Sequence, residues 1–432
     1  MAAVDPSAEG EDEAQLRKEG TGSWRHAAFH VATTIATPAA YAPLPFALAS
    51  LGWPAGMGML VMGTLVTWYS SILVASLWEW DGVPHTNYRE LAQSIFGEKG
   101  YWAVTFFQQF ASLGNNIAIQ IAAGTSMKAI YKIYHQRDNM SLQKFMIIFG
   151  IVELGLSQFP TIHSLRWVNA VCTLSTIGFT TTSIGLSIYN GKKLDRSTID
   201  YKIHGTKSSQ VFGVFNALGT IAFSFGDAML PEIQSTLKSP VKKNMYKGVS
   251  GAYVVIIATY WTLAGFGYWA FGSSVSPYLV NSFIEPSWAI ILANAFAILQ
   301  ICGCYQIYCR PTIGYFEDTL VQRKKSDFNT KTKMLIRLLI TTTYMAIVTL
   351  IACALPFFGD FVALCGAFGF TPLDFVIPAV AFLAVRKPKL KVVWIVNIVI
   401  AMLYTFVSIL GSIGAIRFIT IDIVTYKLFR DL

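Results

Sequence analysis

Apolar blocks long enough to cross a lipid bilayer constrain this chain more than any other feature. A spanning α-helix needs about twenty residues to cross roughly 30 Å of hydrocarbon, and such blocks follow one another along nearly the whole sequence. Charged residues make up 13% of the chain, against about a quarter in an average soluble domain. The sequence therefore predicts an all-α polytopic membrane protein with about eleven transmembrane helices. The blocks lie at about residues 27–50, 55–78, 102–130, 145–160, 167–189, 211–233, 249–271, 287–309, 335–356, 360–385 and 392–416.

An odd number of spans places the two termini on opposite sides of the membrane. With the N-terminus inside, 21 of the 33 Lys and Arg residues fall in cytosolic segments and 12 fall elsewhere. Because short cytosolic loops are enriched in Lys and Arg, we expect a cytosolic N-terminus and an extracytosolic C-terminus. On this topology the sequon at Asn139 lies outside and is a glycosylation candidate. These basic residues form no continuous stripe, so the bilayer is the expected partner and nucleic acid is not.

Two blocks carry helix breakers at matching positions. The first contains three prolines in eight residues, Pro38, Pro43 and Pro45. The sixth combines Gly226 and Pro231 with two carboxylates. Proline removes a backbone donor and clashes with the preceding turn, and broken backbone at membrane depth is tolerated where it faces protein or a polar cavity. We therefore predict discontinuous first and sixth helices, with a simple proline kink as the alternative.

Paired interruptions of this kind indicate a transporter built from inverted repeats, with its binding site at the midplane between the broken helices. The expected fold is two repeats of five helices plus an extra eleventh helix. The predicted parts are a disordered cytosolic tail at residues 1–23, helices one to five at 24–189, an extracytosolic loop at 190–210, helices six to ten at 211–385, and helix eleven with the C-terminal tail at 386–432.

Broken helices offer backbone groups to both ends of a zwitterion. The N–H groups at the start of a half-helix favour an anion, and loose carbonyls favour a cation. A third wall is predicted from the amides of Asn116 and Gln120, for which hydrogen bonding between helices is the alternative. The predicted substrate-binding residues are Thr34, Thr37, Pro38, Ala39, Ala40, Tyr41, Asn116, Gln120, Phe223, Ser224, Phe225, Gly226 and Asp227.

Several carboxylates fall inside the apolar blocks, where an ionisable group is costly unless it is partnered or hydrated. Asp227, Glu153 and Asp374 are therefore candidates for proton coupling. Asp227 is also a candidate to hold a substrate ammonium. The alternatives are a helix cap for Asp227 and structural hydrogen bonding for the other two.

No motif for cofactor or covalent chemistry is found. The sequence contains no Walker A loop, HExxH, GxSxG elbow or dinucleotide-binding glycine pattern. The six cysteines lie in or beside apolar blocks without metal-ligand spacing, so we expect buried thiols. We expect no cofactor, no metal and no enzymatic activity.

Short sequence stretches spread over almost the whole chain after Trp24 are more specific than composition or spacing. These stretches begin at Leu44 (LPFA), Leu51 (LGW), Leu156 (LSQFP), His163 (HSLR), Met229 (MLPEIQ), Gly267 (GYWAFG), Leu355 (LPFFGD), Gly366 (GAFGF) and Pro372 (PLDF). Through them the sequence resembles the plant amino acid/auxin permease family, in the branch of GABA and proline transporters.

This resemblance implies an eleven-helix member of the amino acid, polyamine and organocation superfamily, usually driven by protons, with substrate between helices one and six. The expected function is uptake of small neutral amino acids such as GABA or proline into the cytosol, at the plasma membrane. A membrane amino acid sensor and a carrier of an auxin-like acid remain as alternatives. The chain departs from its relatives in lacking a glycine-rich start to helix one, and in having Asp227 where a neutral residue is expected.

Overall fold

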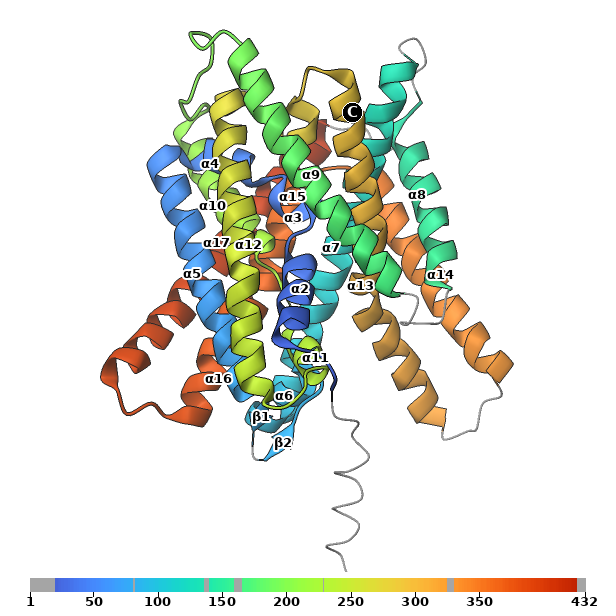
Figure 1. Cartoon of the computed structure of the whole chain (residues 1–432), viewed down its shortest axis with the longest axis vertical. Coiled ribbons are helices and arrows are strands. Elements are labelled where there is room, and N and C mark those ends of the chain that lie inside the picture. The colour runs from blue at the N-terminus through green and yellow to red at the C-terminus, as the bar shows by residue number, and fades with distance from the viewer. Residues whose placement is uncertain are drawn as a thin grey trace, which may run out of the picture.

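The computed structural model describes residues 20–80, 82–135, 140–158, 165–227, 229–324 and 330–425. Within these ranges the chain is a bundle of long helices that run roughly along one axis (Figure 1). Helices occupy the positions of all eleven predicted blocks, which confirms the all-α fold. Asn139 and residues 1–19 of the predicted tail lie outside the described residues.

The helices of the first half are α2 (Trp24–Ile35), α3 (Pro38–Tyr41), α4 (Leu44–Leu51), α5 (Trp53–Leu77), α6 (Tyr88–Phe96), α7 (Glu98–Tyr134), α8 (Leu142–Ser157) and α9 (Leu165–Lys193). Those of the second half are α10 (Lys207–Ser224), α11 (Leu230–Ser235), α12 (Val241–Phe271), α13 (Ser287–Lys324), α14 (Thr330–Ala354), α15 (Phe358–Leu364), α16 (Ile377–Arg386) and α17 (Lys391–Thr425). Short 3-10 turns η2 (Gly272–Ser274) and η3 (Leu279–Ser282) connect α12 to α13.

Length and apolarity identify most of these helices as membrane spans. Among the described residues, seven helices pass both tests, or eight if the pair bent by 57° at residues 36–37 is one span. Helices α7, α8 and α10 also occupy predicted blocks. Amide side chains dilute the apolar character of α7, and α8 has only 16 residues, which is about 24 Å of helix.

The tenth block departs from the continuous α-helix that its apolar run indicates. Between α15 and α16 lie two π-helical segments, η4 (Cys365–Phe370) and η5 (Pro372–Val376). Pro372 has no backbone N–H to continue an α-helical ladder, and the Thr371 hydroxyl donates to the Gly366 carbonyl at 2.8 Å. Such π segments often mark functional sites.

A small hairpin was also not predicted. Strands β1 (Glu79–Trp80) and β2 (Val83–Pro84) pair antiparallel, with Glu79 opposite Pro84. Together with α6 they lie at the end of the bundle where α2 begins (Figure 1). Lys242 at the start of α12 contacts Glu79 at 3.2 Å, so this end is tied together by polar contacts.

The two interrupted helices run antiparallel at the centre of the bundle. The first half of helix one, α2, packs against α11, and its second half, α4, packs against α10. The short helix α3 lies between them, in the middle of the view in Figure 1. The two breaks are therefore brought face to face, as the inverted-repeat prediction requires.

All six cysteines are free thiols enclosed by the helices. Cys302 is partly buried, and the other five are buried: Cys172, Cys304, Cys309, Cys353 and Cys365. This agrees with the prediction that they pack as small apolar side chains.

Candidate functional site between the two broken helices

The first break is made by Pro38. Helix α2 ends at Ile35, Thr37 is extended, and α3 restarts with Pro38 in its first position, where a missing N–H costs nothing. The carbonyls freed by this break have tyrosine partners. The Tyr308 hydroxyl donates to the Thr34 carbonyl at 2.9 Å, and the Tyr260 hydroxyl lies 2.9 Å from the Ile35 carbonyl.

The second break lies between Ser224, where α10 ends, and Leu230, where α11 begins. Two hydroxyls join it to the first break. The Ser224 hydroxyl donates to the Ala40 carbonyl at 2.5 Å. The Tyr260 hydroxyl lies 2.8 Å from the Ser224 carbonyl as well as 2.9 Å from that of Ile35. One phenol therefore contacts broken backbone from both helices.

The structure gathers most of the predicted substrate-binding residues at this junction. The side chains at both breaks are buried, with exposed fractions of 0% for Tyr41 and Ser224 and 3% for Thr37 and Phe223. Tyr41 packs against the Tyr260 ring at 5.3 Å, and its hydroxyl lies 2.8 Å from the Thr180 hydroxyl oxygen. The junction is therefore a compact cluster of aromatic rings around irregular backbone.

The hydrogen bonds of Asn116 and Gln120 go to helices other than the two broken ones. The Asn116 amide donates to the Tyr344 hydroxyl at 2.8 Å. The Gln120 amide donates to the Met146 carbonyl at 3.0 Å and to the Thr349 hydroxyl at 2.8 Å. These partners belong to α14 and α8, so both amides form hydrogen bonds between helices.

The three candidate carboxylates separate into a pair and a single group. The Asp227 backbone N–H donates to Asp374 Oδ2 at 3.2 Å, so η5 and the second break are joined. Asp227 Oδ1 accepts the Met229 N–H at 3.1 Å at the start of α11. Glu153 lies apart on α8, where Gln306 of α13 donates to its carboxylate at 2.7 Å.

Two functional candidates were missed in the sequence, namely Tyr260 and Tyr308. Each lies within an apolar block, and a buried phenol usually needs a hydrogen-bond partner. That need is the signal that points to them, although it does not reveal which backbone they contact.

A cavity of about 910 Å³ lies between α4, α7 and the loop that joins α12 to α13. It is lined by Phe46 and Ser50 of α4, Thr125 of α7, and Tyr278 and Phe358, among others. Its described lining includes no residue of the two breaks. The cavity therefore lies apart from the two breaks, toward the end of the bundle opposite to the β1–β2 hairpin.

Comparison with known proteins decides the identity. The model of the family described as transmembrane amino acid transporter protein matches residues 20–419. The chain belongs to this family. GABA transporter 1 of Arabidopsis thaliana is 37% identical over 424 residues, which cover 95% of this chain and 93% of that protein. Lysine histidine transporter-like 6 of the same plant is 32% identical, covering 94% and 93%. This amino acid transporter is thus an integral membrane protein and not an enzyme.

Solved structures agree on the fold of this transporter. A Na+-coupled sialic acid symporter in a substrate-bound outward-open state superposes with a TM-score of 0.58 at 12% identity, covering 96% of this chain and 92% of that one. MhsT in complex with L-phenylalanine gives 0.56 at 12% identity, covering 92% and 100%. At this identity the likeness establishes a shared fold and no more.

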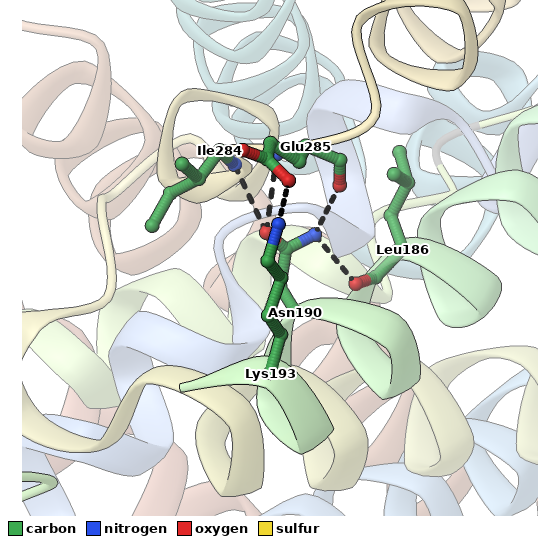
Figure 2. Close-up of polar contacts among 5 residues, drawn as sticks. All are labelled: Leu186, Asn190, Lys193, Ile284 and Glu285. Carbon is green, nitrogen blue, oxygen red and sulfur yellow. Dashed lines mark hydrogen bonds and ion pairs between the residues drawn. The ribbon is translucent and has the colours of Figure 1, made fainter. Parts of the chain in front are cut away.

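The loop between α12 and α13 forms part of the wall of the transporter's large cavity, and Asn190 of α9 holds it in place (Figure 2). The Asn190 amide donates to the Glu285 carbonyl at 2.7 Å, and its oxygen accepts the N–H groups of Ile284 and Glu285, both at 3.2 Å. Lys193, one turn further, forms an ion pair with the Glu285 side chain.

The substitution Asn190→Ala should therefore destabilise the transporter. It leaves partly buried backbone groups of the loop without their partner, and a typical hydrogen bond contributes about 0.5–1.5 kcal/mol. The measurement is the thermal midpoint of the purified protein in detergent. Lys193→Ala is the matched control, because exposed ion pairs contribute roughly 0–1 kcal/mol. Equal midpoints for the two variants would contradict this role of Asn190.

Proposed function

We propose that this transporter is a proton-coupled symporter that carries small neutral amino acids, of the GABA or proline kind, into the cytosol by alternating access. The observation that supports this proposal is the meeting of two broken helices at the centre of the bundle. A zwitterion can be bound there by half-helix N–H groups and freed carbonyls. The 37% identity to a GABA transporter supports the substrate class.

The proposed orientation places the N-terminus in the cytosol and the C-terminus outside, at the plasma membrane. The excess of Lys and Arg in alternate loops supports it. In this orientation the cavity of about 910 Å³ faces outward, because its lining includes Phe418 and Asp422 near the end of α17. Substrate would then enter from outside and reach the junction from above.

Uptake in this proposal requires the packed junction to open. Backbone from Thr37 to Ala40 would receive the substrate carboxylate, and carbonyls such as that of Ile35 would receive the ammonium. The hydroxyls of Tyr260 and Ser224 hold the two breaks together, so substrate would take over part of these contacts. Asn116 and Gln120 would support the α7 wall through their bonds to α14 and α8.

Proton coupling is assigned to the buried carboxylates. Asp227 is the leading candidate, since it belongs to the second break itself and contacts Asp374 through its backbone. Glu153 remains a candidate in a separate position, with Gln306 as its partner. An ionisable group at membrane depth is a functional candidate because its burial is costly.

Uptake of a labelled amino acid panel into oocytes, with current recorded at acidic and at slightly alkaline outside pH, tests this function. We expect accumulation of one or a few small neutral amino acids, with inward current that acid enhances. Water-injected oocytes are the control. Saturable binding without accumulation would contradict transport and favour a sensor, and accumulation without dependence on outside pH would contradict proton coupling.

A further inference from the structure

A second, much smaller cavity lies beside Asp227, which is one of its lining residues. It is enclosed between α5, the break before α11, and the π segment η5, and its volume is about 10 Å³. A space of this size accommodates about one water-sized occupant. Its polar lining residues are Thr67, Ser70, Ser71, Tyr88, Asp227 and Asp374.

Two polar atoms in this lining lack a hydrogen-bond partner among the described residues, namely Asp227 Oδ2 and Ser70 Oγ. Both side chains are deeply buried, with exposed fractions of 5% and 1%. Their neighbours are already engaged, since the Thr67 hydroxyl donates to the Gly63 carbonyl at 2.7 Å. Leaving a buried polar atom unpaired is costly, and one occupant between Asp227 and Ser70 would satisfy both atoms.

The charge around the cavity selects a cation. Asp374 is adjacent on η5, and Glu232 on α11 is close enough to interact with Asp227 electrostatically. Arg89 of α6 interacts with Glu232, and its guanidinium lies 5.4 Å over the Tyr315 ring. The other titratable groups facing this cluster are the phenols of Tyr88, Tyr253 and Tyr308.

No ion pair found within the described ranges includes Asp227 or Asp374. Buried carboxylates without a basic partner require a bound cation or a proton. Carboxylate and hydroxyl oxygens are also the ligands that hard cations prefer. An anion or an apolar group is therefore excluded as the occupant of this cavity.

We propose that this cavity is the coupling-ion site, where the oxygens of Asp227, Asp374 and Ser70 bind one small monovalent cation, either a hydrated proton or sodium. The inference rests on the proposed ion-coupled uptake. Asp227 would connect ion binding to the second break, because its Oδ1 holds the first turn of α11 while its Oδ2 faces the ion. The ion would thus fix the break at which the substrate binds.

The first test measures ion binding on the purified full-length protein, without transport. An ion that binds only the native state raises its thermal midpoint. Sodium is titrated at neutral pH, and acid is titrated in sodium-free choline buffer. Stabilisation by sodium identifies sodium. Stabilisation by acid, together with an infrared carbonyl band of a protonated carboxyl group that Asp227→Asn removes, identifies the proton. No stabilisation by either ion would overturn the site.

The second test compares two serine variants. Ser70→Ala removes one oxygen from the cavity and should raise the half-saturating ion concentration about tenfold, the effect of losing a hydrogen bond to a charged group. Ser183→Ala is the matched control, because Ser183 is equally buried and its hydroxyl also lacks a described partner, but it lies on α9 outside this cavity. Equal ion dependence in the two variants would overturn the proposal.

These readouts separate the site from the proposed function. If no amino acid is taken up but ions still stabilise the wild type and not Asp227→Asn, the ion site stands and symport fails. If uptake depends on an ion and neither Ser70→Ala nor Asp227→Asn changes the ion-induced shift, symport stands and this site fails.

Discussion

The substitution Tyr260→Phe should reduce uptake at low substrate concentration at least about tenfold. The Tyr260 hydroxyl contacts carbonyls of both breaks, those of Ile35 and Ser224. A buried carbonyl that loses its partner costs about 1–3 kcal/mol, and about 1.4 kcal/mol corresponds to a factor of ten. Because both breaks form the proposed binding site, the loss should alter their relative position. The measurement is initial uptake, normalised to the amount of protein at the cell surface.

Tyr268→Phe is the control on the same helix. Tyr268 is also fully buried, but among the described residues its hydroxyl bonds to the Tyr201 carbonyl alone, at 3.3 Å, near the end of α12. That variant should keep uptake within about twofold of the wild type, since a neutral hydrogen bond contributes about 1 kcal/mol or less at such a distance. Similar uptake by the two variants would show that the phenol at the breaks has no special role.

The largest effect on stability is expected for Gly366→Ala. An added Cβ would lie 2.0 Å from the Gly219 carbonyl oxygen and 2.6 Å from the Phe223 backbone nitrogen. These are backbone atoms, so relief requires η4 and α10 to separate. Overpacking typically costs about 1–3 kcal/mol, and we expect at least the upper end here. The measurement is the yield of monodisperse protein in detergent and its thermal midpoint.

Gly265→Ala provides the comparison for this glycine. No heavy atom lies within 4 Å of a Cβ added at Gly265 on α12, and alanine is favoured over glycine in a helix by about 1 kcal/mol. This variant should match or exceed the wild type in stability. A Gly366→Ala protein as stable as Gly265→Ala would show that the close approach of η4 to α10 is not required.

The breaks in helices one and six could be predicted because their cause is local. Pro38 cannot continue α2, and the Gly226 to Pro231 segment cannot continue α10. Each effect acts within one turn of backbone, so the sequence alone carries it. The spans were predicted for a similar reason, since membrane thickness fixes their length.

The partners of the broken backbone could not be predicted, because they depend on packing between distant segments. The contact of Tyr308 with the Thr34 carbonyl joins residues 274 positions apart. The meeting of Asp227 with Asp374 depends on the π segment η5, which an apolar run does not reveal. Asn116 and Gln120 lie on one face of α7, and this spacing fits a cavity wall and a contact between helices equally well.

The burial of all six native thiols has a practical consequence for following motion in this transporter. A maleimide reagent requires an accessible thiolate, and five of the six sulfhydryls are buried while Cys302 is partly so. A single cysteine introduced at exposed Val83 on β2, or at exposed Ile284 beside the large cavity, should therefore dominate labelling of otherwise native protein. Probes attached at those two places would report separately on movements at the two faces of the membrane.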